Sequence, residues 1–307
     1  MSLPTDPAAT SAPSVPPESA WQRFAKTVTV LRGAGKAPLL EPTDPGLLFR
    51  TTRDARGRPF ELRMDVYRVP AGQASDGTNC LLIHGGSFVL GDRAMTACRF
   101  LATRLVGEGI TVASADYRLT QQNGTFPRPV RDVKAALAYW VENAERFGAD
   151  PAKVTLVGIS AGGALSLLAL GWADDHPLLA VPGGRPLATP GVRQMASVYA
   201  VSEFSSFTRG ITPWLRRWVT GTSDPERWRA MAPTTSCGFD APLLQIHGDA
   251  DTVVPVEQTH RMDAARRALG KHVETHIYPG VAHAFFSYPG CEAAERGWSD
   301  LIRFVRS

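Results

Sequence analysis

Residues 154–170 read VTLVGISAGGALSLLAL, and their pattern decides the fold. A short apolar run with β-branched residues ends in Gly-x-Ser-x-Gly, and an apolar segment of helical length follows. This order predicts a strand, a sharp turn and a helix, with Ser160 at the apex. Glycine at 158 and 162 fits such a turn, because a Cβ atom at either position would clash where helix and strand meet. The helix N-terminus then points at the Ser160 hydroxyl, which we interpret as a nucleophile.

The segments around this turn alternate between strand and helix patterns from residue 79 onward. Strands are predicted at 80–83, 110–115, 192–200, 242–247 and 272–278, and helices at 93–106, 129–147, 256–269 and 292–305. Such alternation predicts an α/β fold with a mostly parallel central sheet and helices on both faces. Two earlier strand patterns, at 47–52 and 60–69, are separated by the hairpin-like residues 54–58, so the sheet is expected to begin antiparallel.

The chain is predicted to form one domain over residues 21–307. Residues 1–20 are rich in Pro, Ala, Ser and Thr and lack the features of a signal peptide, so we expect a disordered leader. Cap or lid elements are expected at about 21–45, which includes a short helix from Trp21 to Leu31, and at about 202–232. The second element has helix starts at Thr212 and Asp224, each followed by proline.

Composition excludes several classes of function. The chain of 307 residues is 44% apolar and 20% charged, and it has no apolar run near the ~20 residues of a membrane span. Its net charge of +4 is spread out, which argues against a nucleic-acid partner. Four scattered cysteines fit free thiols in a reducing cytoplasm. No cluster has metal-ligand spacing, so neither a metal nor a cofactor is expected. A homo-oligomer is compatible with this composition.

A serine hydroxyl is a weak nucleophile unless an imidazole accepts its proton and a third group orients that imidazole. Asp249 and Asp251 follow the strand predicted at 242–247, and His283 follows the last predicted strand. Side chains at the carboxyl ends of parallel strands meet at one edge of the sheet. The order Ser160, Asp251, His283 matches that of α/β-hydrolase triads. Asp251 is favoured as the acid, and the alternative, Asp249, is expected to hold its loop.

The sequence HGGSF at 84–88 suits an oxyanion hole, because small residues let backbone N–H groups approach a developing negative charge. The predicted donors are the N–H groups of Gly86, Ser87 and Ala161, while His84 is expected to brace the loop. Aromatic residues near these motifs are candidates for an apolar substrate pocket: Phe88, Trp214, Trp218 and Phe285. The tryptophans at 214, 218 and 228 have a second interpretation, which is that they anchor the two short helices to the body.

As a set, these motifs resemble the α/β-hydrolase superfamily, and within it the carboxylesterases related to hormone-sensitive lipase and the bacterial BD-FAE-type esterases. The resemblance extends from Asn79 to Arg306. It rests on HGGSF at 84–88, DYRL at 116–119, FP at 126–127 leading into DVKAA at 132–136, GADP at 148–151, GISAGG at 158–163, HGDAD at 247–251 and HAF at 283–285. The resemblance implies a serine carboxylesterase that cleaves small-molecule esters through an acyl-enzyme.

Two departures from this family pattern concern the substrate. Ser87 replaces the third glycine of the lipase-like HGGG, as in kynurenine formamidase-like members, and DYRL continues as the unusual TQQN at 120–123. An arylformamidase or another amide hydrolase with the same triad is therefore an alternative. A non-catalytic binding protein with this fold is a further alternative, and it is disfavoured because the serine, the aspartate and the histidine are all present.

Overall fold

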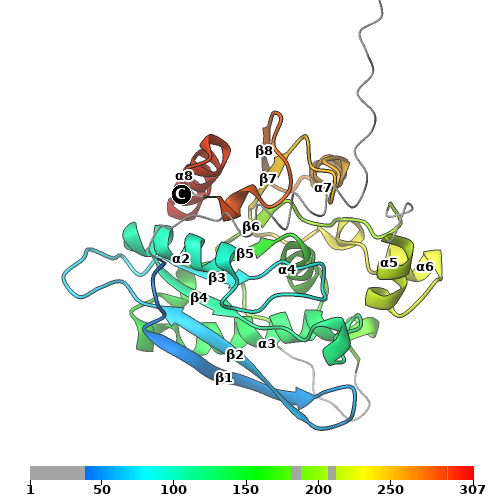
Figure 1. Ribbon diagram of the computed structural model, residues 1–307, viewed down its shortest axis with the longest axis horizontal. Coiled ribbons are helices and arrows are strands. Elements are labelled where there is room, and N and C mark those ends of the chain that lie inside the picture. Colours follow the sequence, from blue (N-terminus) through cyan, green and yellow to red (C-terminus); the bar gives the residue numbers. More distant parts are fainter. Residues whose placement is uncertain (1–38, 181–187, 207–211, 289) are drawn as a thin grey trace, which may run out of the picture.

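The computed structural model of the protein describes residues 39–180, 188–206, 212–288 and 290–307. Within this part, eight strands form one sheet (Figure 1). Their spatial order is β1 (Asp44–Arg53), β2 (Pro59–Tyr67), β4 (Thr111–Ala115), β3 (Asn79–Ile83), β5 (Val154–Ile159), β6 (Gln194–Val198), β7 (Leu243–Gly248) and β8 (Val273–Tyr278). The predicted leader at 1–20, the predicted helix at 21–31 and most of the cap predicted at 21–45 lie outside the described residues.

The sheet is antiparallel at its beginning and parallel thereafter, as the sequence predicts. β1 pairs antiparallel with β2, and β2 pairs antiparallel with β4. Every pairing from β4 through β3 to β8 is parallel. The β1–β2 hairpin closes through Asp54, whose N–H donates to the Arg58 carbonyl over 2.9 Å and whose carboxylate accepts from the N–H of Arg56 and of Arg58. The predicted hairpin is confirmed.

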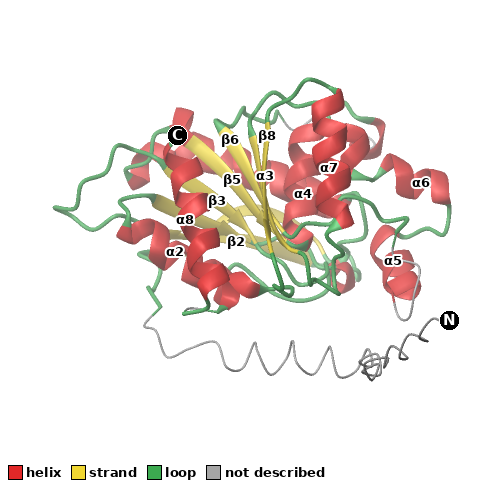
Figure 2. Cartoon of the chain, turned by 90° about the horizontal axis from the view of Figure 1, so that it is seen from above, coloured by secondary structure: helices red, strands yellow, loops and turns green. Residues whose placement is uncertain are grey.

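Helices cover both faces of the sheet. α2 (Thr96–Gly107) and α8 (Glu292–Arg306) lie on one side, and α4 (Ala161–Gly171) and α7 (Glu257–Ala268) lie on the other (Figure 2). α3 (Arg128–Asn143) packs beside α4. Short 3₁₀ turns occupy Thr120–Gln122, Ala144–Phe147, Pro151–Lys153, Pro177–Leu179, Pro233–Ser236 and Phe285–Ser287. This arrangement confirms the predicted α/β-hydrolase architecture.

Strand β3 shows why both faces must be covered. Leu81 and Ile83 pack into the core beneath α3 and α4, whereas Cys80 and Leu82 pack into the core beneath α2 and α8. All four side chains are fully buried. An unbroken apolar run is what a strand needs when successive side chains point to two buried faces. The run at 80–83 therefore specified a central strand.

Several predicted element boundaries were wrong, and three of them have a structural explanation. α2 begins at Thr96 rather than 93, because Arg93 binds the carboxylates of Asp65 and Asp116 through its side chain and its own N–H. α3 ends at Asn143, and a 3₁₀ turn continues the buried stripe to Phe147. β6 ends at Val198 because Tyr199, at φ 38°, turns the chain out of the strand.

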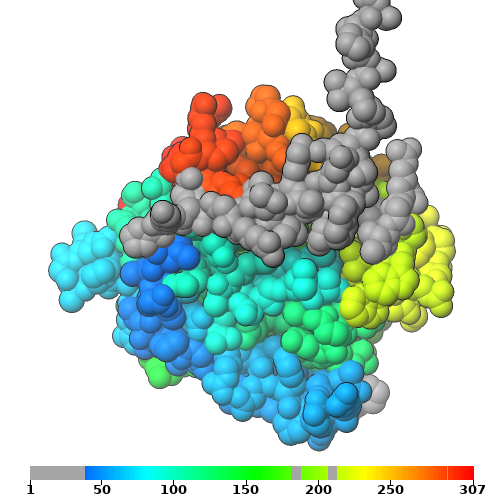
Figure 3. Space-filling view, viewed as in Figure 1, coloured from blue at the N-terminus to red at the C-terminus, as the bar shows by residue number. Residues whose placement is uncertain are grey.

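Two short helices stand between β6 and β7, as predicted. α5 (Thr212–Thr220) and α6 (Pro225–Ala230) form the yellow-green and yellow surface at one end of the molecule (Figure 3). The Asp224 carboxylate accepts from the N–H of Glu226 over 2.9 Å, which makes it the predicted N-cap of α6. Trp228 connects the two helices, because its indole N–H donates to the Thr220 hydroxyl and to the Thr222 carbonyl. Trp228 also packs against the core beneath α3 and α4, so it anchors these helices to the body, as the second interpretation expected.

The close contact between β5 and α4 allows a direct test of how this fold is packed. A Cβ atom on Gly158 would lie 2.5 Å from the Cα atom of Gly163, whereas one on Gly107, at the end of α2, would meet nothing within 4 Å. We expect Gly158→Ala to lower the free energy of unfolding by about 3 kcal/mol or more, because backbone has to move to relieve the overlap. Gly107→Ala should leave it unchanged or raise it by up to about 1 kcal/mol. Urea unfolding of both variants checks this, and equal midpoints would contradict it.

Candidate active site

Ser160 lies at a sharp turn between β5 and α4. Its backbone has φ 53° and ψ −116°, a conformation that is rare for a residue with a side chain. Its N–H donates to the Val198 carbonyl over 2.8 Å, which ties the turn to β6. A Cβ atom on Gly162 would lie 2.2 Å from the Ile83 carbonyl oxygen, so α4 approaches β3 as closely as it approaches β5. The predicted strand–turn–helix and the reason for its glycines are both confirmed.

The structure brings Ser160, His283 and Asp251 together from three loops. The Ser160 hydroxyl lies 3.1 Å from Nε2 of His283, and Nδ1 of His283 lies 2.5 Å from Oδ2 of Asp251. These residues follow β5, β8 and β7, so the carboxyl edge of the parallel sheet holds all three. The imidazole has one nitrogen on the hydroxyl and the other on the carboxylate. It can therefore accept the hydroxyl proton while the carboxylate stabilises the resulting charge.

The Asp251 carboxylate is buried and fully hydrogen-bonded. Its Oδ1 accepts from the N–H groups of Val253 and Val254, each over 2.8 Å, and its Oδ2 faces both His283 and His247. Burial alone raises the pKa of this carboxyl, but the His283 charge and the hydrogen bonds from His247, His283 and Val254 outweigh burial and hold the pKa well below its usual range. Asp251 is therefore an anion at neutral pH.

Asp249, the alternative acid, has a different place. It is exposed, and its Oδ1 accepts from the N–H of Gly280 over 2.6 Å. This bond joins the loop after β7 to the loop that leads from β8 to His283. Asp249 therefore holds the loops together, as the sequence suggested, and the described residues contain no hydrogen bond between Asp249 and His283.

Two tyrosines support the site, and sequence reasoning assigned no role to either. The Tyr199 ring packs edge-on against His283, with 4.6 Å between ring centroids. Tyr117 stacks on His84 at 4.2 Å, and its hydroxyl donates to the carbonyls of His84 and Gly85. Burial, with the nearby Asp251 charge, raises the pKa of Tyr199 well above its usual value. Tyr199 follows a strand end and Tyr117 lies in the DYRL motif, so position alone could have suggested both.

The loop after β3 presents unpaired backbone donors beside Ser160. Gly85 lies so close that a Cβ atom there would be 3.2 Å from the Ser160 Cβ atom. Gly86, Ser87 and Phe88 all have positive φ angles, of 108°, 54° and 67°. Among the described residues, the N–H groups of Gly86, Ser87 and Ala161 donate no hydrogen bond. Such a set of free donors could bind an anionic oxygen.

His84 braces this loop, as expected. Its Nδ1 lies 2.7 Å from the Gly85 carbonyl, and because a carbonyl only accepts, Nδ1 carries the hydrogen. Burial lowers the pKa of His84, so the ring is neutral at physiological pH. The side chain is fully buried, and among the described residues it makes no hydrogen bond to the Ser160 hydroxyl.

The four predicted pocket residues separate into three places. Phe88 is buried beside the Gly86–Ser87 turn and packs with Phe126 and Phe204 in a triangle with ring centroids 5.2–6.0 Å apart. Trp214 and Trp218 pair with each other on α5 and are 60% and 38% exposed. Phe285 lies in a third place. Its ring packs against Tyr199, Tyr278 and Phe286 in the core beneath α2 and α8, because the 3₁₀ turn after His283 directs it inward.

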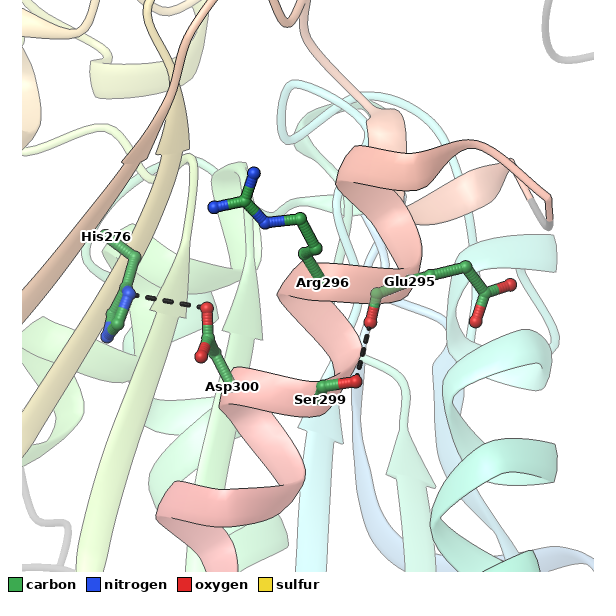
Figure 4. A pocket seen from close by; sticks show the side chains of 5 residues that line it. All are labelled: His276, Glu295, Arg296, Ser299 and Asp300. Atoms are coloured by element: carbon green, nitrogen blue, oxygen red, sulfur yellow. Dashed lines mark hydrogen bonds and ion pairs between the residues drawn. The ribbon is translucent and has the colours of Figure 1, made fainter.

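A surface pocket of ≈380 Å³ lies apart from these residues, between β8 and α8 (Figure 4). It is lined by His276, Glu295, Arg296, Ser299 and Asp300. His276 pairs with Asp300 at 3.3 Å and with Glu274 at 2.6 Å, so the polar groups at this pocket largely satisfy one another. None of the lining residues belongs to the Ser160 site.

The described residues contain no group of three or more His, Cys, Asp or Glu side chains that could hold a metal ion. Among the helices they form, none is long and apolar enough to cross a membrane.

The chain is similar in sequence to several known esterases and hydrolases. Esterase LipC of Mycobacterium tuberculosis is 31% identical over 72% of this chain, and ethyl acetate hydrolase of Pseudomonas putida is 34% identical over 82% of this chain and 78% of its own length. The chain spans only about half of the mycobacterial relatives LipC, LipQ and LipM, 53–56% of their lengths.

Solved structures show the same fold at lower identity. Esterase 2 of Thermogutta terrifontis with bound propionate has a TM-score of 0.66 at 23% identity and covers 86% of this chain and 94% of its own. The acetyl ester-xyloside bifunctional hydrolase of Caldicellulosiruptor lactoaceticus has a TM-score of 0.70 at 18% identity and covers 87% of this chain and 97% of its own.

The dienelactone hydrolase family model matches residues 234–307, and the BD-FAE family model matches residues 64–265. With two thirds of its length matched by that model, the chain belongs to the BD-FAE family of α/β-hydrolases.

Proposed function

We propose that this protein is a serine carboxylesterase that cleaves small-molecule esters, with Ser160, His283 and Asp251 as its catalytic triad. The observation that carries the proposal is the continuous hydrogen-bond chain from the Ser160 hydroxyl through His283 to Asp251, with spacings of 3.1 and 2.5 Å. The names of the relatives, which include esterases and an ethyl acetate hydrolase, support the same class of reaction.

In the first half of the reaction, the Ser160 Oγ attacks the ester carbonyl carbon while Nε2 of His283 takes the hydroxyl proton. Asp251 keeps Nδ1–H of His283 oriented and stabilises the imidazolium that forms. The carbonyl oxygen becomes an oxyanion, and the N–H groups of Gly86, Ser87 and Ala161 are the proposed donors to it. Each such donor contributes on the order of 3 kcal/mol to the transition state.

In the second half, the carbon–oxygen bond to the alcohol breaks and His283 returns the proton to the departing alkoxide. The acyl group remains on Ser160 as an ester. A water molecule then attacks this acyl-enzyme, with His283 accepting the water proton and delivering it to Ser160 as the acid product leaves. His283 therefore acts alternately as base and acid, and the enzyme returns to its starting protonation state.

The substrate pocket is proposed to lie between the Gly86–Ser87 turn and the helices α5 and α6. Phe88 follows the oxyanion donors directly, and its ring is locked by Phe126 and Phe204, so these rings would form a rigid apolar wall. Trp214 and Trp218 are proposed to contribute at the exposed rim through α5. Because the packed rings would occupy the space that a long acyl chain needs, we expect this wall to favour short acyl groups.

Hydrolysis of p-nitrophenyl esters from acetate to decanoate tests the nucleophile. We expect activity that peaks at short chains and a kcat/KM on the order of 10⁴-fold or more lower in Ser160→Ala, because the acyl-enzyme cannot form. Ser166→Ala is the matched control, since Ser166 is a buried serine on the same helix whose hydroxyl has no partner within the described residues. It should retain full activity.

If wild-type protein cleaves N-formyl anilides but none of these esters, the formamide alternative replaces the esterase. If Ser160→Ala retains wild-type hydrolysis of every substrate, the triad proposal is wrong.

The two aspartates can be ranked by parallel substitution. Asp251→Asn should lower kcat by about 10³- to 10⁴-fold, because an amide can donate to Nδ1 and so favour the wrong histidine tautomer. Asp249→Asn should change kcat by less than about 3-fold, since an amide oxygen still accepts from the Gly280 N–H. Steady-state kinetics with p-nitrophenyl acetate measures both, and the reverse ranking would transfer the role of acid to Asp249.

A further inference from the structure

A second histidine contacts the same carboxylate oxygen of the proposed catalytic acid as His283 does. His247 lies near the end of β7 and is fully buried. Its Nε2 lies 3.2 Å from Oδ2 of Asp251 and 2.8 Å from the Val254 carbonyl oxygen. Its Nδ1 lies 2.7 Å from the hydroxyl of Thr259 on α7. A fully buried imidazole with three polar neighbours is held in a single orientation.

These neighbours determine where the His247 hydrogen resides. The carboxylate of Asp251 and the carbonyl of Val254 can only accept hydrogen bonds, so Nε2 must carry a hydrogen and donate to both. In the neutral ring Nδ1 is then an acceptor, and the Thr259 hydroxyl is its donor. Were the ring charged, Nε2 would still donate. The N–H of His247 therefore points at Asp251 in either protonation state.

We propose that His247 is a positioning residue that holds Asp251 in the orientation required by His283, with the Thr259 hydroxyl holding the His247 ring in place through Nδ1. This inference rests on the proposed function, because it takes Asp251 as the catalytic acid. Oδ1 of Asp251 is held by the N–H groups of Val253 and Val254, and Oδ2 is shared by the two histidines. With His247 in place, the carboxylate cannot rotate away from Nδ1 of His283.

The contacts also explain what removal of the imidazole would do. Oδ2 would keep His283 as its only side-chain donor among the described residues, and the Val254 carbonyl would lose a buried donor. The carboxylate and its loop could then turn, which misplaces His283 relative to Ser160. Catalysis is sensitive to such errors, since a displacement of about 1 Å can cost about 100-fold in rate. Substrate binding has no direct dependence on His247, because His247 is fully buried.

The test compares His247→Leu, which removes the donor, with His247→Gln, whose amide N–H reaches the position of Nε2. We expect His247→Leu to lower kcat for p-nitrophenyl acetate by about 10- to 100-fold with KM within about 3-fold, and His247→Gln to recover most of that loss. His276→Leu is the matched control. It removes a histidine from the neighbouring strand β8 that contacts Glu274 and Asp300 and no residue of the triad, so kcat should be unchanged.

A folded His247→Leu variant with wild-type kcat would overturn the proposal, as would equal losses in His247→Leu and His247→Gln. If His247→Leu does not fold, Thr259→Val and Thr259→Ser decide instead. Valine removes the hydroxyl that donates to Nδ1, and serine retains it. The proposal expects a lower kcat in Thr259→Val that Thr259→Ser restores, and wild-type kcat in both variants would refute it.

A substrate-independent measurement separates this inference from the proposed function. The hydrogen between Nδ1 of His283 and Asp251 should give a downfield proton NMR resonance, which Asp251→Asn removes and so identifies. We expect this resonance to shift and broaden in His247→Leu and to persist in His247→Gln. Persistence in both variants would refute the positioning role. Absence of Ser160-dependent hydrolysis in the wild-type protein would refute the esterase proposal. The NMR comparison would still test whether His247 positions Asp251.

Discussion

The architecture of the site depends on backbone contact between β5 and α4 with no side chain between them. Gly158 and Gly163 meet at a distance that excludes a Cβ atom, and Gly162 lies equally close to β3. Because the helix starts this near the sheet, the connecting residue must turn sharply, and Ser160 takes a positive φ. The strain is offset by the N–H bond to Val198 and by packing on both sides. The turn also leaves the N–H of Ala161, the first residue of α4, without a partner among the described residues.

A buried charge imposes the second constraint. Taking the Asp251 carboxylate out of water is costly unless its oxygens find donors. Two backbone N–H groups and two imidazoles supply them, and the pKa of the carboxyl stays low despite burial. The same donors fix its orientation. Charge stabilisation and geometric positioning are thus provided by one set of hydrogen bonds, which reach from Thr259 on α7 to Ser160 at the start of α4.

The aromatic residues show that tertiary packing can place two phenylalanines from similar sequence positions in different parts of the molecule. Phe88 and Phe285 each follow a proposed catalytic motif within a few positions, yet one packs with Phe126 and Phe204 near the oxyanion donors and the other fills the core beneath α2 and α8. The difference arises from the turn that follows each motif. Positive φ angles run from Gly86 through Phe88, whereas Ala284, at φ 65°, starts a 3₁₀ turn that directs Phe285 inward.

The sequence by itself determined the sheet, its change from antiparallel to parallel pairing, and the turn at Ser160, because each depends on local periodicity or on glycines in a short segment. It also identified Asp251 and His283 as candidates, because both follow strand ends. Tertiary structure alone decided the starting residue of α2, the core position of Phe285, and the contacts of Tyr199 and His247 with the triad. These depend on pairs such as His247 and Thr259, which lie on different elements, so no local pattern encodes them.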